Sequence, residues 1–253
     1  MAETAEATFE QYAELEPSHP TLIEGLPGHG LVASIAVDQI QRQLGLTHYG
    51  SIWSDDFPPV VTFQDGLVRD LVRVYAGADP AVMTLQSDLA LPPSAFNTLG
   101  HCVLNKLAPK FDRAVFLAGA PAQSEQQVGE VTAVATTEAV RDDIQAAGVQ
   151  LAEETGLVGG VTGALVKECY HADVPAGVLI VRAHPFLPDP GAAQTLIEEA
   201  LEPLVEFDID TTELREQADE IQEQMQQIAQ QYQQMAQEQQ PQEPQQAAPG
   251  MYQ

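Results

Sequence analysis

The feature that most constrains the fold of this chain is a regular alternation of two patterns between residues 21 and about 204. Short apolar runs rich in β-branched residues alternate with longer segments whose apolar residues recur at helical spacing. This alternation is typical of α/β proteins, in which helices connect the strands of a sheet. Several runs are apolar throughout, which favours strands covered on both faces. The sequence therefore predicts a three-layer α/β sandwich with a mostly parallel or mixed central sheet.

The two periodicities also place the individual elements. Strands are expected at residues 21–24, 50–53, 60–63, 67–75, 81–86, 113–118, 130–135 and 177–183. Helices are expected at residues 31–44, 94–107, 137–147, 161–170 and 192–204. Hairpin-like connections within residues 50–86 precede the later β-α-β units, and this combination favours a mixed sheet.

After Phe207 the composition changes, and Gln and Glu dominate. The predicted division is an α/β body at 1–209, a coiled-coil helix at 210–236 and a disordered tail at 237–253. The helix carries a heptad seam, in which apolar residues alternate by four and three: Leu214, Ala218, Ile221, Met225, Ile228, Tyr232 and Met235. Because so narrow a stripe gains little alone, we expect a partner helix and favour a parallel coil of identical chains. Two alternatives stay open: the stripe packs on its own body, or the coil is a scaffold that recruits another protein.

The tail is built mainly from Gln, Pro, Ala and Glu, a composition typical of disordered segments. It ends in Met251, Tyr252 and Gln253. These residues offer an apolar side chain, a phenol and a free carboxylate, and chain ends of this kind are captured by peptide-binding pockets. The sequence predicts a tether that presents a terminal ligand.

Charge excludes several classes of partner. Ten Lys and Arg stand against 37 Asp and Glu, so the formal net charge is -27 and the pI is about 4.2. Such a field repels nucleic acid and anionic membranes. Acidic residues scattered over the whole body are typical of salt-adapted proteins, in which ionic strength screens self-repulsion. With an acidic amino terminus and no long apolar stretch, the protein is expected in the cytoplasm.

The sequence offers no clear catalytic motif. The glycine spacing of residues 25–30, GLPGHG, differs from the dinucleotide fingerprint. In residues 158–170, Gly163 is followed by Ala164 and not by the lysine of a phosphate loop. The segment RAHPFLPDP, residues 182–190, predicts a rigid connection with Asp189 or Pro190 near a helix start.

The candidate ligand residues also show no recognisable site. Five histidines lack metal-ligand spacing: His29, His48, His101, His171 and His184. Two cysteines in apolar surroundings, Cys102 and Cys169, are interpreted as buried thiols. No catalytic residue, cofactor or metal site is predicted.

Three segments together resemble the proteasome assembly chaperone family in its archaeal branch: GLPGHGLVASIAVDQI, GLVGGVTGALVKE and AHPFLPDPGAA. The resemblance covers about residues 22–210. It implies a three-layer α/β body, self-assembly into a homo-oligomer and, in members that end in hydrophobe-Tyr-X, binding to the 20S proteasome α-ring. Met251, Tyr252 and Gln253 match that ending. By this resemblance, the Gln253 carboxylate pairs with a lysine in a pocket between α-subunits.

The leading hypothesis is an ATP-independent proteasome-binding protein, either an assembly chaperone or an activator, that is not an enzyme. The sequence contains no Walker loop to couple ATP hydrolysis to unfolding. The main alternative is a binding protein or enzyme for a small molecule of nucleoside type. In that case a pocket at a strand edge would be lined by four glycines: Gly28, Gly30, Gly159 and Gly160.

Overall fold

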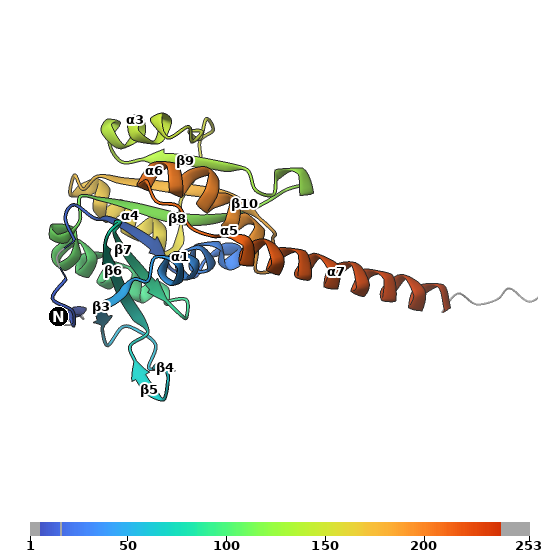
Figure 1. Cartoon of the computed structure of the whole chain (residues 1–253), viewed down its shortest axis with the longest axis horizontal. Helices are drawn as coiled ribbons and strands as arrows, with labels where there is room; N and C mark the ends of the chain where they lie inside the picture. The colour runs from blue at the N-terminus through green and yellow to red at the C-terminus, as the bar shows by residue number, and fades with distance from the viewer. Residues whose placement is uncertain (1–5, 16, 239–253) are drawn as a thin grey trace, which may run out of the picture.

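The computed structural model describes residues 6–15 and 17–238, with side chains described as far as residue 228. Eight strands form one sheet in the order β1-β3-β6-β7-β2-β8-β10-β9, and two further strands form the separate hairpin β4-β5 (Figure 1). The sheet strands are β1 (Thr8–Gln11), β2 (Thr21–Gly25), β3 (Thr47–Trp53), β6 (Val72–Ala78), β7 (Ala81–Ser87), β8 (Arg113–Pro121), β9 (Val131–Ala135) and β10 (Ala176–Ala183). The hairpin strands are β4 (Thr62–Gln64) and β5 (Leu67–Arg69).

The sheet is mixed. Its centre, β7-β2-β8-β10, is parallel, whereas β1, β3 and β6 on one side and β9 on the other pair antiparallel. This confirms the predicted α/β fold with a mixed central sheet. Parallel pairs need crossover connections, which the helices between these strands supply.

Helices cover both faces of the sheet. They are α1 (Val32–Gln43), α2 (Phe96–Cys102) continued by η3 (Val103–Leu107), α3 (Glu138–Ala146), α4 (Gly160–His171), α5 (Pro190–Leu196) continued by η6 (Ile197–Leu201) and α6 (Glu202–Val205), and α7 (Thr212–Glu238). Among the described residues, no helix is both long and apolar enough to span a bilayer.

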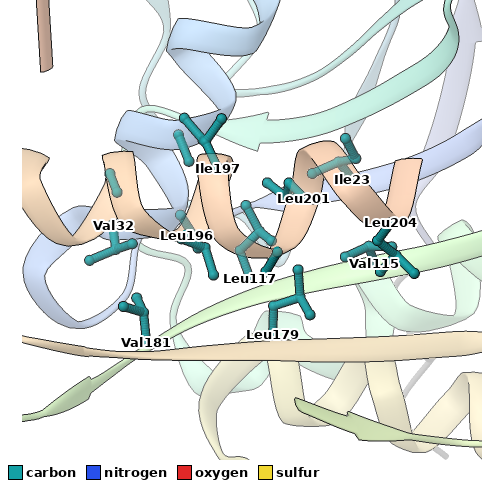
Figure 2. Packing of buried hydrophobic residues seen from close by; sticks show 14 of the residues in the cluster. Ile23, Val32, Val115, Leu117, Leu179, Val181, Leu196, Ile197, Leu201 and Leu204 are labelled. Carbon is teal, nitrogen blue, oxygen red and sulfur yellow. The ribbon is translucent and has the colours of Figure 1, made fainter. Parts of the chain in front are cut away.

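Two hydrophobic cores lie on opposite faces of the sheet, and alternation along the strands assigns residues to each. Leu22 of β2 belongs to the core under α2 and α4, whereas its neighbour Ile23 belongs to the core under α1, α3 and α5. Successive side chains of a strand point to opposite faces, so an apolar run serves both cores. Figure 2 shows the second of these cores, where strand residues such as Leu117 and Leu179 meet Leu196 and Leu201.

Three expectations for the strands need correction. The predicted strand at 67–75 is two strands, β5 and β6, because the chain leaves the hairpin and enters the sheet at Asp70 and Leu71. The predicted strand at 60–63 begins at Thr62, beyond two prolines at 58 and 59 that cannot donate ladder hydrogen bonds. Strand β1 was not predicted, because its four residues form a mostly exposed edge with little apolar pattern.

The final helix, α7, is anchored to the body at its first turns. Leu214 is 1% exposed and belongs to the core under α1. Gln39 of α1 donates to the carbonyl of Asp210 (2.6 Å), and Arg42 of the same helix pairs with Glu213 (2.8 Å). From this anchor α7 extends away from the sheet (Figure 1). A helix was therefore correctly predicted here, whereas the boundaries of body, coil and tail stay a prediction.

Candidate functional site

Three segments rich in glycine or proline converge at the carboxyl ends of the central strands. The first is residues 25–30, the second residues 158–170 and the third residues 182–190. They adjoin the parallel strands β2, β8 and β10, whose carboxyl ends lie at the same end of the sheet. The backbone N–H of Asp189 donates to the carbonyl of Gly30 (2.9 Å), which ties the third segment to the first. Gly119 of β8 passes so close to His29 that a Cβ atom would overlap the His29 carbonyl oxygen. The glycines at these contacts thus permit close backbone packing.

Asp189 orders the third segment. One carboxylate oxygen accepts from the backbone N–H of Ala192 (2.9 Å) and caps the first turn of α5, while the other accepts from that of His184 (2.7 Å). An N-cap carboxylate satisfies a backbone donor that the helix leaves unpaired. The predicted rigid connection, with Asp189 at the helix start, is confirmed.

A buried carboxylate that sequence reasoning missed links the first and second segments. Glu24 of β2 is fully buried, accepts from the backbone N–H of Leu26 (3.0 Å) and accepts from the Thr162 hydroxyl of α4 (3.3 Å). Burial raises the pKa of Glu24 to about 8, although hydrogen bonds from Leu26, Thr162 and Leu117 oppose the shift. The signal in the sequence was one acidic residue inside an otherwise apolar strand.

A pocket of about 370 Å³ opens between the carboxyl ends of β2 and β7. The connections from these two parallel neighbours run to opposite faces of the sheet, since α1 packs in one core and α2 in the other. Such a switch point is the usual place for ligands in α/β sheets. Its lining includes Gly25, Ser34, Arg42 and Ser87, but not the four glycines of the nucleoside hypothesis.

The two cysteines are buried inside the body. Cys102 and Cys169 are free and buried, as predicted, and burial raises the pKa of each thiol to about 11, which disfavours the reactive thiolate. Among the described residues, no group of His, Cys, Asp and Glu is arranged to hold a metal ion.

The predicted heptad seam of α7 divides in two. Leu214 is buried in the body, Ala218 lies against Gly191 of α5, and Ile221 is half-buried. Ala218, Ile221 and Met225 also line a groove of about 500 Å³ beside residues 184–190. Met225 is nevertheless 42% exposed, and the next seam residue, Ile228, is 49% exposed. The alternative that the stripe packs on its own body thus describes its first residues, whereas a partner helix for the later ones stays a prediction.

The remaining predicted site residues fall outside the part of the chain whose side chains are described. They are Tyr232 and Met235 of the seam and the terminal Met251, Tyr252 and Gln253.

Residues 22–229 match the model of the PAC2 family. This chain belongs to the PAC2 family. The match contains all three converging segments and the anchored part of α7. The resemblance to the proteasome assembly chaperones that these segments indicated is therefore confirmed at the level of the family.

Relatives of known structure share the fold of this PAC2 protein. It is similar to PbaA of Pyrococcus furiosus, an archaeal homolog of proteasome-assembly chaperone, with a TM-score of 0.80, 24% identity and coverage of 92% of this chain and 95% of that one. It is also similar to PbaB of Pyrococcus furiosus, an archaeal proteasome activator, with a TM-score of 0.78, 20% identity and coverage of 88% and 99%. An uncharacterized protein of Methanocaldococcus jannaschii is 30% identical over 191 residues, 75% of this chain and 77% of that protein.

Proposed function

We propose that this PAC2 protein binds the 20S proteasome α-ring and assists its assembly or activates it. The observation that carries the proposal is the match of body and α7 to the PAC2 family over residues 22–229. The likeness of the fold to PbaA and PbaB supports it, since one is a homolog of a proteasome-assembly chaperone and the other a proteasome activator.

The anchored helix suits the delivery of a terminal ligand. Leu214 in the core and the Arg42–Glu213 pair (2.8 Å) hold the start of α7 on the body, and α7 continues outward to Glu238 (Figure 1). In this proposal the side chain of Met251 fills an apolar pocket, Tyr252 packs and hydrogen-bonds, and the Gln253 carboxylate pairs with a lysine of the α-ring.

Self-association would place several terminal tails on one oligomer and so increase the number of contacts with the α-ring. We propose that the later seam residues, from Met225 to Met235, form a parallel coil between copies, since Met225 and Ile228 are 42% and 49% exposed whereas Leu214 is buried. Several tails on one oligomer bind with an avidity beyond that of each tail, provided that the tethers reach their pockets together.

The proposed action needs neither ATP nor catalysis. Tails that bind the open conformation of the α-ring more tightly than the closed one shift the equilibrium towards opening, by as much as the difference in binding free energy. The same contacts, made on incomplete rings, would favour their assembly. We propose that the protein acts in the cytoplasm without a cofactor.

The decisive experiment compares full-length protein with a version that ends at Gly250 in a pull-down of native 20S proteasome at high salt. We expect full-length protein to capture proteasome and the truncated version to lose capture, while light scattering finds the same molar mass for both. Equal capture by both versions would refute docking through the terminal residues. Capture by neither would refute proteasome binding and leave the pocket at the switch point as the place to test ligands.

A further inference from the structure

A groove runs along the first half of α7, between this helix and two connections of the body. It has a volume of about 500 Å³, and its walls are residues 125–128, residues 184–190 and the face of α7 from Ala218 to Gln226. The connection between β8 and β9, which contains residues 125–128, lies at the end of the sheet from which α7 leaves (Figure 1). The groove shares no lining residue with the pocket between β2 and β7, so it is a separate feature.

A hydrogen bond and close packing hold the walls in place. The backbone N–H of Gly129 donates to the carbonyl of Arg182 (2.8 Å), which ties the β8-β9 connection to the end of β10. On the other side, a Cβ atom at Gly191 would lie 3.4 Å from that of Ala218, so α7 packs closely on the first turn of α5. The groove is thus formed before a partner binds, and a partner spends little free energy on shaping it.

The lining of the groove is mostly apolar and partly open to solvent. Val128 is 40% exposed and Met225 42%, and Phe186, the neighbour of a lining residue in the sequence, is 88% exposed. All three walls contribute apolar residues to the lining: Val128, Leu187, Pro188, Pro190, Ala218, Ile221 and Met225. Exposed apolar residues that cluster in this way mark interaction sites.

Charge indicates which kind of partner fits the groove. The segments that contain its walls, residues 122–130, 184–202 and 212–228, hold eleven acidic residues and one basic residue, for a net charge of -10 (1 - 11). They make up less than a fifth of the chain but carry more than a third of its charge of -27. Among the described residues that line the groove, none is a lysine or arginine, whereas Glu125 and Asp189 are acidic. An apolar groove in such a field attracts a partner with apolar and basic residues.

The shape of the groove fits a helix. The groove follows α7 over about two turns, or about 12 Å, and α7 presents Ala218, Ile221 and Met225 to it at spacings of three and four residues. Helices pack by inserting the side chains of one between such rows of the other. A partner helix therefore needs an apolar stripe of the same spacing, and long basic side chains beside this stripe can reach the acidic segments.

A second copy of this chain fits the groove less well. Its own helix carries an apolar stripe, but residues 212–228 have a net charge of -4 (1 - 5), so two copies of this segment repel each other. The coil proposed above uses a neutral stretch, since residues 224–237 contain no charged residue. The groove and that coil overlap only at Met225 and Gln226.

We propose that this groove binds an amphipathic helix of a partner protein. The apolar stripe of the partner lies against Ala218, Ile221 and Val128, and lysines or arginines on either side of the stripe face the acidic segments. The inference goes beyond the proposed function, because this partner binds at the base of α7 and leaves the terminal residues free.

The first test measures the binding of fluorescently labelled peptides to the full chain by fluorescence anisotropy. The probe is a helical peptide of Leu and Lys, about 18 residues or five turns long, with all its Leu residues on one face. One matched peptide has Glu in place of Lys, and another has the same Leu and Lys residues in an order that forms no apolar face. We expect only the first peptide to bind tightly, and its affinity to fall as KCl is raised from about 0.1 M to about 1 M.

The second test uses full-length variants to locate the binding in the groove. Val128→Gln leaves the net charge and α7 unchanged and should weaken binding of the amphipathic Leu and Lys peptide about fivefold or more, as loss of a central apolar contact does. The matched control is Leu67→Gln, because Leu67 is also exposed, at 72%, but lies outside the groove. Thermal unfolding should show that both variants keep the fold, as expected for exposed positions.

Equal binding by wild type and Val128→Gln would overturn the inference, and so would equal binding of the peptide without an apolar face, because charge alone would then explain the attraction. Failure of wild type to bind the amphipathic peptide would also overturn it. These results are independent of proteasome capture, since the version that ends at Gly250 keeps the groove and should bind the peptide like the full chain. A failed pull-down of proteasome, together with peptide binding that Val128→Gln weakens, would refute the proposed function and leave this inference standing.

Discussion

Glu24 shows how one buried residue couples the fold to pH. Its pKa rises to about 8 from an ordinary value of 4.5 because burial penalises the carboxylate. The folded state therefore holds this proton at pH values where the unfolded chain has released it. Stability is highest when Glu24 is protonated in both states and decreases as the pH rises from about 4.5 to about 8.

Glu24→Gln should remove this pH dependence. An amide keeps the shape of the protonated acid: its oxygen can accept from the backbone N–H of Leu26 and its NH2 group can donate to the Thr162 hydroxyl. The variant should therefore be more stable than wild type by a few kcal/mol above about pH 8. Urea unfolding of both proteins at about pH 5 and about pH 9 measures the difference. Glu138→Gln, at an exposed position, is the control and should follow wild type. Equal stability of wild type and Glu24→Gln at both values would contradict the raised pKa.

Gly119→Ala tests whether the converging segments depend on close packing. The new Cβ would overlap the carbonyl oxygen of His29 and force β8 and the first segment apart, at a cost of about 1–3 kcal/mol. In the matched control, Gly156→Ala, a Cβ meets no atom within 4 Å, so little change is expected. A fall in melting temperature for Gly119→Ala alone is the expected result. Equal melting temperatures would mean that the backbone relaxes without cost.

At the scale of elements, the first turn of α7 is buried in the body, whereas later residues of its apolar stripe are partly exposed. Leu214→Ala should destabilise the body by about 2–4 kcal/mol, because it leaves a cavity in the core that contains Leu214. Met225→Ala, at 42% exposure, should leave the unfolding of the body nearly unchanged. Denaturant unfolding at a fixed protein concentration compares the two. A large loss of stability in Met225→Ala that grows on dilution would instead place the coil at the centre of folding.

The two elements that leave the body point in different directions. The hairpin β4-β5 projects on one side of the sheet, and α7 extends along another axis (Figure 1).

At the scale of the whole molecule, a formal charge of -27 makes stability depend on salt. The screening length falls from about 10 Å at 0.1 M salt to about 3 Å at 1 M, so repulsion among exposed carboxylates weakens steeply. We expect the melting temperature to rise with KCl concentration over this range. Scanning calorimetry across a salt series measures the effect. A melting temperature that falls as salt is added would contradict dominant self-repulsion.

Several features of the fold follow from local pattern. The apolar runs of β2, β8 and β10 and the helical spacing of α1 were recognisable because each periodicity repeats within one element. The segment 182–190 was correctly interpreted because prolines and an N-cap aspartate act on their immediate neighbours. The split at Asp70 was missed, since nothing local separates a hairpin strand from the sheet strand that follows it.

The sequence by itself determined the α/β class, the helix at the end of the body and, through three short segments, the family. Periodicity and glycine placement are local properties, so they can be recognised in the amino-acid sequence alone. Only the tertiary structure decided that these segments meet at one end of the central strands, that Glu24 is buried between them and that Leu214 is buried in the core while Met225 stays 42% exposed. Burial depends on which distant strands and helices become neighbours, and the residues of one element do not specify those neighbours.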